Sequence, residues 1–370
     1  MMRSLFLTVC SLLLLASCRK GIIIPSIMSE EIPGFQRQPD GAGTVQGFYL
    51  LNEGNMNMNK SSLDYVDLIN GAYVRRTYEA QNPEVVKGLG DVGNDLQIYG
   101  GKLYAIINNS NKVEVLDAAT GKRIRQVIIQ QCRYITFYKE KAYVTSNAGY
   151  ISVMDTTALQ ETARIPTGRN PEQMAIAGNK LYVANSGGYN PKNYERTVSV
   201  IDLDTQQELK RIDVAINLHR IVADKYGDLY VTSRGDYYDI PSRLYVIDTK
   251  TDLVKKEFPI GASNICINGN LAYIYCVEWS YHTHKNTISY AMIDVRSETL
   301  LDRKFITDGT DAKIEIPYGI AVDPDTEDVF VTDALDYVSP GILYCFDKTG
   351  KQKWKMETGD IPAHFAFLKK

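Results

Sequence analysis

Tyrosine, tryptophan, histidine and asparagine gather in five polar segments of this sequence. The segments are residues 52–60, 185–196, 233–240, 278–285 and 333–340. Aromatic rings with a polar handle, beside amides that donate and accept hydrogen bonds, suit contact with a large amphipathic ligand or a protein surface. The side chains that we expect to contact such a ligand are Asn55, Tyr189, Asn190, Tyr194, Arg234, Tyr237, Tyr238, Trp279, Tyr281, His282, His284 and Tyr337.

Two of these residues raise the question of a metal ion. His282 and His284 are two positions apart, so an extended segment would direct both to one side. A metal site would need a further ligand, which Glu278 or another loop could supply. An isolated His-x-His pair is a weak pattern for zinc, and the polar loops do not match a calcium-binding loop. We therefore predict no metal and no resident cofactor.

The elements that must position the five segments form a repeat. A strand, a loop and a second strand ending in aspartate recur along the chain, as in residues 180–185 and 197–202. The closing aspartates, 38 to 53 residues apart, are Asp67, Asp117, Asp155, Asp202, Asp248, Asp294 and Asp347. Each repeat is long enough for four short strands. Seven such repeats predict an all-β, seven-bladed β-propeller with four-stranded blades. Each aspartate is expected to accept backbone N–H bonds in the following turn.

The two ends of the repeat predict how the ring closes. The first repeat begins at about residue 47 without an inner strand, and residues 361–368 are left over at the end. We expect this C-terminal strand to pair into the first blade, so that no strand edge stays open. A recurrent aromatic position of the second strand is expected to pack between blades, and its members are Tyr49, Tyr104, Tyr143, Tyr182, Tyr230, Tyr273 and Phe330.

The five polar segments fall in one kind of loop. In a four-stranded blade, the loops between the second and third strands share one face of the ring with the connections between blades, so we expect the segments to converge on one mouth of the central channel. Five elaborated loops on one face favour a binding face. The inner strands begin at the same mouth, and there we expect Asp91, Arg133, Gln173, His219, Arg220, Tyr318 and His364.

Catalysis is the competing interpretation of this mouth. Propellers host lactonases and metal-dependent lyases, and His219, Arg220, His364, Glu172 and Asp91 could act as acids or bases. The sequence has no recognisable nucleophile motif and no strong metal-ligand set, so we expect a binding protein and not an enzyme. A third possibility is a scaffold that binds other proteins of the cell envelope.

The N-terminus is typical of a bacterial lipoprotein. Arg3 precedes an apolar run over residues 5–16, and Leu15-Ala16-Ser17-Cys18 resembles a lipobox. We expect a signal peptide over residues 1–17, lipidation of Cys18, a tether over residues 18–46 rich in proline and glycine, and the propeller over residues 47–370.

Composition and cysteine usage limit the partners. The 370 residues are 44% hydrophobic and 23% charged with a net charge of −3, and no basic stripe indicates a nucleic acid. Apart from Cys10 and Cys18, the cysteines are Cys132, Cys266, Cys276 and Cys345. Each lies in a strand-like run, and their spacing is not that of metal-binding cysteines, so we expect buried thiols.

Several segments resemble the YncE-like seven-bladed propellers. The similar stretches are KLYVANS and TVSVIDLDT, NKVEVLDAATGK, and GRNPEQMAIAGNKLYVAN. The segments FYLLNEGN, Gly90-Asp91-Val92, DKYGDLYVTS and VTDALDY look like a Bacteroidetes lipoprotein branch of that group, which includes the BtuG-type proteins. The resemblance covers residues 47–368.

The resemblance implies a function in nutrient uptake. BtuG-type proteins are surface lipoproteins that capture cobalamin and pass it to a TonB-dependent outer-membrane transporter. By that resemblance we expect cobalamin or a related corrinoid as transported ligand, such a transporter as partner, and a lipid anchor in the outer membrane at the cell surface. The run after Cys18, Arg19-Lys20-Gly21, departs from the acidic run of surface-exported lipoproteins, and the side of the membrane stays open.

Overall fold

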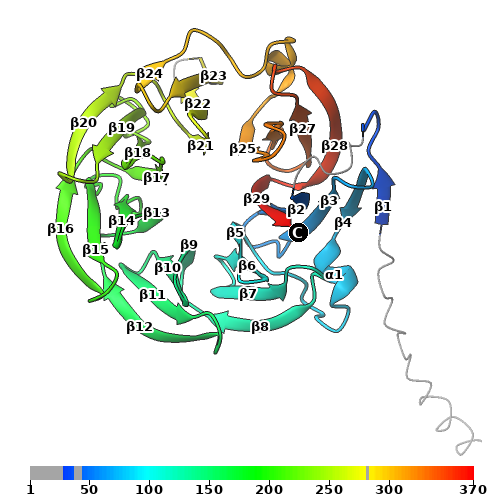
Figure 1. Ribbon diagram of the computed structural model, residues 1–370, viewed down its shortest axis with the longest axis horizontal. Helices are drawn as coiled ribbons and strands as arrows, with labels where there is room; N and C mark the ends of the chain where they lie inside the picture. Colours follow the sequence, from blue (N-terminus) through cyan, green and yellow to red (C-terminus); the bar gives the residue numbers. More distant parts are fainter. Residues whose placement is uncertain (1–27, 37–43, 281–282) are drawn as a thin grey trace, which may run out of the picture.

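Seven antiparallel sheets stand around a central axis, as the predicted β-propeller requires (Figure 1). The computed structural model describes residues 28–36, 44–280 and 283–370. Cys18, Tyr281 and His282 lie outside the described residues. No described helix is long and apolar enough to cross a membrane.

The first three blades follow the chain in order, except that the first one takes strands from both ends. Blade one contains β1 (Met28–Glu31), β2 (Val45–Asn52), β3 (Ser62–Asp67), β4 (Ala72–Arg75) and β29 (Pro362–Lys369). Blade two contains β5 (Gly93–Tyr99), β6 (Lys102–Ile107), β7 (Lys112–Asp117) and β8 (Arg123–Ile128). Blade three contains β9 (Cys132–Tyr138), β10 (Lys141–Ser146), β11 (Tyr150–Asp155) and β12 (Gln160–Pro166).

The remaining blades repeat the same order from the inner to the outer strand. Blade four contains β13 (Pro171–Ala177), β14 (Lys180–Asn185), β15 (Thr197–Asp202) and β16 (Gln207–Asp213). Blade five contains β17 (Leu218–Ala223), β18 (Asp228–Ser233), β19 (Arg243–Asp248) and β20 (Leu253–Phe258). Blade six contains β21 (Asn264–Asn268), β22 (Leu271–Ser280), β23 (Lys285–Asp294) and β24 (Thr299–Leu300). Blade seven contains β25 (Pro317–Val322), β26 (Val329–Asp333), β27 (Pro340–Phe346) and β28 (Gln352–Asp360).

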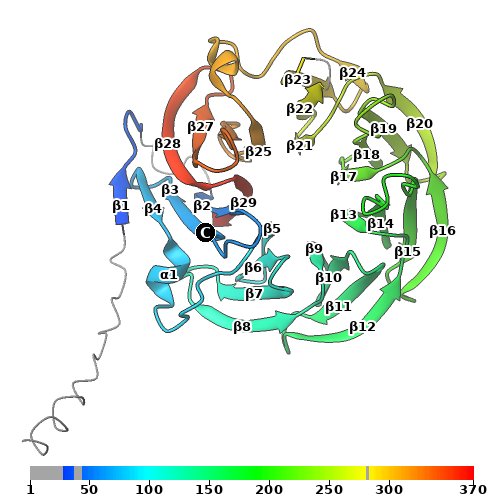
Figure 2. The same ribbon diagram turned by 180° about the vertical axis from the view of Figure 1, so that it is seen from behind.

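The ring closes through the C-terminal strand, as predicted. β29 pairs antiparallel with β2, with Phe48 opposite Phe367 and Leu50 opposite Phe365. β29 also contacts β5 of blade two and β25 of blade seven, and the other inner strands contact one another in turn around the channel. Seen from behind, the same inner strands surround the central axis (Figure 2). Closure covers β2, which would otherwise be the inner edge strand of blade one.

The repeated side chains behave as the sequence predicts. All seven closing aspartates accept backbone N–H bonds in the turn that follows, as Asp202 does from Asp204 and Thr205 at 3.0 and 2.7 Å. The seven recurrent aromatic residues of the second strand are all buried. Three of them also connect blades through their hydroxyls: Tyr49 donates to the Ala118 carbonyl at 3.0 Å, Tyr182 to Asp252 at 2.6 Å and Tyr230 to the Val295 carbonyl at 3.4 Å.

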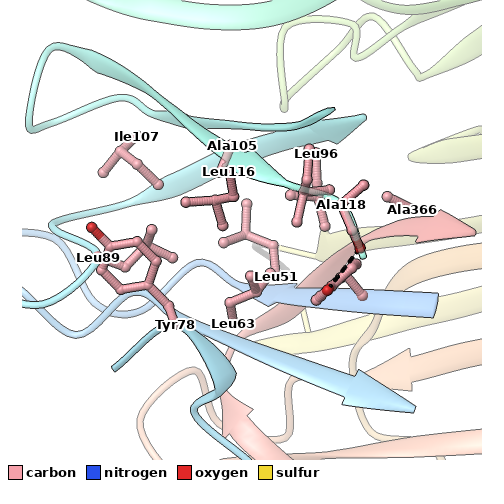
Figure 3. Close-up of a cluster of buried hydrophobic side chains, with 12 residues drawn as sticks. Leu51, Leu63, Tyr78, Leu89, Leu96, Ala105, Ile107, Leu116, Ala118 and Ala366 are labelled. Atoms are coloured by element: carbon pink, nitrogen blue, oxygen red, sulfur yellow. Dashed lines mark hydrogen bonds between the residues drawn. The ribbon is translucent and has the colours of Figure 1, made fainter. Parts of the chain in front are cut away.

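Apolar side chains fill the spaces between blades. Between blades one and two, Leu51 and Leu63 meet Leu96 and Leu116 in a buried cluster (Figure 3). The dashed bond in that view ends at Ala118, whose carbonyl accepts from the Tyr49 hydroxyl at 3.0 Å. This packing fixes each inner strand relative to its neighbour, and so fixes the mouth that the inner strands surround.

Four features of the structure differ from the regular four-stranded blade or add detail to the sequence predictions. The segment expected to be only a tether contains β1, which pairs with β4, and Ile32, which is buried against blade one. A short helix, α1 (Thr77–Gln81), and a 3₁₀ turn (Thr310–Lys313) interrupt connections where no helix was expected. β24 has only two residues. The four cysteines in the described part are free, and three of them are buried while Cys266 is partly buried.

Candidate functional site

A pocket of about 510 Å³ lies where the inner strands of several blades meet the long loops. This volume is within the range of small-molecule sites. The loops of blades five, six and seven supply one part of the lining, and the starts of inner strands supply the other. The lining residues are Glu53, Val92, Asn94, Arg133, Tyr134, His219, Arg220, Arg234, Tyr237, Tyr238, Ile240, Pro241, Ser242, Ala262, Ser263, Tyr275, Val277, Glu278, Trp279, Asn286, Pro317, Tyr318 and Tyr337.

Ion pairs organise one side of the pocket floor. The Arg133 guanidinium donates to Glu172 Oε2 from Nε at 3.1 Å and from Nη2 at 2.7 Å. Arg234 Nη1 reaches Glu172 Oε1 at 3.4 Å. Burial alone would raise the pKa of Glu172, but the charges of Arg133 and Arg234 hold that pKa below its ordinary value. One buried carboxylate therefore orients two arginines.

A tyrosine and a histidine lie beside these arginines. Tyr134 Oη and His219 Nε2 are 2.9 Å apart. The guanidinium carbons of Arg133 and Arg220 lie 5.5 and 5.1 Å from the centre of the Tyr134 ring, within cation–π range. Burial, and after it the charges of Arg234 and Arg220, lowers the pKa of His219 well below its ordinary value. His219 is therefore neutral near pH 7.

A carboxylate occupies the opposite side of the floor. Glu53 follows β2 in the loop of blade one, and it accepts from the Tyr318 hydroxyl at 2.9 Å. Its other oxygen lies 3.0 Å from His364 Nε2. Burial and the Glu53 charge raise the pKa of Tyr318 well above its ordinary value, so the Tyr318 hydroxyl stays protonated and donates. Both acids of the floor, Glu172 and Glu53, thus have partners within the protein.

The rim differs from the floor because its aromatic rings are exposed. Trp279, Tyr237, Tyr238 and Tyr337 expose 49%, 53%, 75% and 40% of their surfaces, whereas Tyr134 on the floor exposes 3%. The pocket therefore combines a charged, buried floor with an aromatic rim that a ligand would meet first.

Two rim tyrosines share an unusual backbone. Tyr237 and Tyr337 have φ values of 67° and 65°, in the left-handed region that non-glycine residues rarely adopt. Each follows an aspartate whose carboxylate fixes the turn, since Asp236 accepts from the backbone N–H of Tyr238 and Ile240. The corresponding turn of blade seven is fixed by Asp336. Such strain is common at functional sites.

The pocket brings together nine of the residues that the sequence indicated. These are Arg133, His219, Arg220, Arg234, Tyr237, Tyr238, Trp279, Tyr318 and Tyr337. His364 and Gln173 are not part of the lining: His364 contacts Glu53, and Gln173 accepts from the backbone N–H of Ile221. His284 is exposed, with its ring 6.4 Å from that of Trp279.

Other expected residues lie elsewhere. The Tyr189 hydroxyl accepts from Asn147 of blade three at 2.8 Å, and Asn190 beside it is exposed, so both belong to the blade-four side of the face. Tyr194 is partly buried and is not part of the pocket lining. Asn55 donates to the Tyr337 carbonyl and so links two loops. Asp91 binds Asn109 at 2.6 Å and does not line the pocket.

Sequence reasoning missed Glu53, Tyr134 and Tyr275 as lining residues, and a β-bulge explains one of them. A strict two-residue period directs Tyr134 away from the channel if Arg133 faces it. The pairing of β9 with β10 shifts register beside Cys132, as do the starts of β5, β13, β17 and β25. Such a shift lets two consecutive residues face the mouth. The sequence did contain a sign of this arrangement: two consecutive polar residues recur at the starts of inner strands, as in Arg133-Tyr134 and His219-Arg220.

Among the described residues, no group of three histidine, cysteine, aspartate or glutamate side chains is arranged to hold a metal ion. The expected pair His282 and His284 lies only partly within the described chain.

A sequence profile described as Domain of unknown function (DUF5074) matches residues 46–367. The chain belongs to the DUF5074 family. This DUF5074 propeller is similar in structure to Kuenenia stuttgartiensis hydrazine synthase, with a TM-score of 0.57 and 17% identity over 69% of this chain and 76% of that one. It is also similar to the computationally designed Ika8 protein, with a TM-score of 0.55 and 13% identity over 88% of this chain and 92% of that one. No curated protein sequence matches the DUF5074 chain.

At these identities, the two structural likenesses concern the fold alone. The site of the DUF5074 propeller must be interpreted from its own residues.

Proposed function

We propose that this protein captures a small amphipathic ligand in the pocket at the loop-rich mouth and does not convert it chemically. The observation that carries the proposal is the combination of an exposed aromatic rim with a buried, charged floor in one cavity of about 510 Å³. Rigid inner strands hold the floor, which limits the ordering that binding would require.

Cobalamin or a related corrinoid is the first ligand that we propose. A corrinoid has a broad apolar ring with amide arms around it. Trp279, Tyr237 and Tyr238 offer aromatic contact to such a ring, while Asn286 and Ser242 offer amide and hydroxyl partners. The resemblance to BtuG-type lipoproteins supports the same ligand class. Since the cavity is small for a whole corrinoid, part of the ligand would stay outside the rim.

The proposed setting follows from that resemblance. Lipidation at Cys18 would anchor the protein in the outer membrane, facing the cell surface, and a TonB-dependent transporter would receive the ligand. Co-purification of the full-length lipoprotein with a TonB-dependent transporter from the same cells tests this part, and a free protein in mild detergent would contradict it.

Calorimetric titration with cyanocobalamin tests the ligand. We expect saturable heat at micromolar concentration and a Tyr238→Ala variant that binds at least about fivefold more weakly, because an aromatic contact contributes roughly 1 kcal/mol or more. The control is Tyr226→Ala, which removes another exposed tyrosine in the β17–β18 turn, where Tyr226 donates to Asn270 of blade six.

Absence of heat with wild-type protein at micromolar cyanocobalamin would rule out the corrinoid. Recovery of a chemically altered ligand after incubation would rule out capture without conversion.

A further inference from the structure

One cation of the pocket, Arg220, has no hydrogen-bond or ion-pair partner for its guanidinium among the described residues. Arg133 and Arg234 share Glu172, as described above. The Arg220 guanidinium, in contrast, makes no hydrogen bond or ion pair with any residue in the described ranges, and its Nε is completely buried. The side chain as a whole is partly exposed to the pocket, and leaving its buried Nε without a hydrogen bond costs free energy.

We propose that the ligand of this pocket carries an oxyanion, a carboxylate or a phosphate, which accepts hydrogen bonds from Arg220. This inference rests on the proposed binding function and specifies the chemical class of its ligand. A guanidinium presents parallel N–H groups that match carboxylate and phosphate oxygens, and such charge-assisted bonds are stronger than neutral ones.

The acids near Arg220 are engaged elsewhere. Glu53 is held between Tyr318 and His364 at 2.9 and 3.0 Å. Asp95 accepts from the backbone N–H of Leu96 and of Ile135, at 2.9 Å each. Both carboxylates are close enough to act on the Arg220 charge, but neither forms a hydrogen bond or ion pair with its guanidinium.

The surroundings of Arg220 are positive and orient its side chain. The Tyr134 ring lies 5.1 Å from the guanidinium carbon and limits where the group can point. Arg133 and Arg234 contribute two further positive charges to the same floor, and Glu172 is the one acid paired with them in the described part of the chain. The lowered pKa of His219 agrees with this positive potential.

The floor and the rim together define the ligand class. An oxyanion at Arg220 would leave the rest of the molecule against Trp279 and the rim tyrosines. This arrangement fits a ring-containing carboxylate or phosphate ester. Cobalamin itself carries one phosphodiester, so the inference and the proposed ligand are compatible.

Three small probes with one ring in common test the charge requirement: benzoate, phenyl phosphate and neutral benzamide. Binding is measured by ligand-observed NMR at constant ionic strength. With wild-type protein, we expect benzoate or phenyl phosphate to bind at least about tenfold tighter than benzamide, as one charge-assisted pair would give. If benzoate binds more tightly than phenyl phosphate, the ligand carries a carboxylate; the opposite order indicates a phosphate.

Variants locate the anion. Arg220→Gln should abolish the preference for the anionic probes, and Arg220→Lys should keep part of it. Arg196→Gln is the matched control, because Arg196 pairs with Asp213 at the outer part of blade four. Equal binding of benzoate, phenyl phosphate and benzamide by the wild type, or an anion preference that survives in Arg220→Gln, would overturn the inference.

The outcomes separate this inference from the corrinoid proposal. Anion preference without cyanocobalamin binding would support the Arg220 site and remove the corrinoid, whereas the reverse result would remove the Arg220 site alone. If Arg220→Gln fails to fold, the comparison of the three probes with wild-type protein still tests whether the pocket prefers an anionic ligand, and Arg220→Lys still tests whether Arg220 binds it.

Discussion

At the scale of single residues, the pocket floor depends on Glu172, which pairs with two arginines while 5% exposed. Glu172→Gln would leave Arg133 and Arg234, whose side chains are 18% and 26% exposed, without their counter-charge. We expect a loss of about 3 kcal/mol in the free energy of unfolding, as for other broken buried pairs. Urea denaturation at pH 7 measures it, and Glu208→Gln, which breaks the surface pair with Arg211, should cost less than about 1 kcal/mol.

The same pair predicts a dependence on pH. The folded-state pKa of Glu172 is lowered, so its stabilising contribution is present above the unfolded-state pKa of about 4.3 and is lost as pH falls through the folded-state value. The stability difference between wild type and Glu172→Gln should therefore be full at pH 6 and shrink below about pH 4.3. A difference that stays constant from pH 6 to pH 3 would contradict the role of the ion pairs.

Part of this site was predictable from residue types. The sequence placed four lining residues at the mouth, because they lie at the starts of inner strands and all inner strands of a propeller start on the same face. These residues are Arg133, His219, Arg220 and Tyr318. Tyr134 was not among them, because a β-bulge breaks the two-residue period on which the expectation relied. Which side chain pairs with which, as Glu53 does with His364 across the joined ends of the chain, depends on three-dimensional proximity that spacing does not encode.

At the scale of elements, tyrosine hydroxyls connect neighbouring blades. The Tyr182 hydroxyl of blade four donates to Asp252 of blade five at 2.6 Å. Tyr182→Phe should lower the free energy of unfolding by about 1–2 kcal/mol, because a buried charged acceptor loses a donor. Tyr104→Phe is the matched control, since the Tyr104 hydroxyl is buried without a partner among the described residues, and its loss should be neutral or slightly stabilising. Equal losses in the two variants would contradict this account.

The strands themselves were largely predictable, because a period-two apolar pattern closed by an aspartate turn recurs in every blade. The exceptions occur where an element departs from the average blade. β22 and β23 each extend over ten residues and leave a two-residue β24. β1 comes from a proline- and glycine-rich segment whose composition alone indicates a linker.

At the scale of the whole molecule, the ring is one cooperative unit only if β29 closes it. Removing residues 360–370 would expose the apolar faces of β2 and open both neighbouring interfaces. We expect the loss of a single cooperative thermal transition. Removing residues 1–36 takes away β1 from the outer edge of the same blade, and with it Ile32, but leaves β29 paired, so it should lower the melting temperature much less. A truncated ring that melts cooperatively at the full-length temperature would contradict the closure.

The central claim is that the aromatic rim receives a ligand over the charged floor. The chain has two tryptophans, of which Trp279 is exposed at the rim and Trp354 is buried. Tryptophan fluorescence during titration with cyanocobalamin, compared between wild type and Trp279→Phe, is the most direct test. We predict saturable quenching at micromolar ligand in the wild type that is largely lost in Trp279→Phe, whereas the absence of saturable quenching, or equal quenching in both proteins, would contradict ligand binding at this rim.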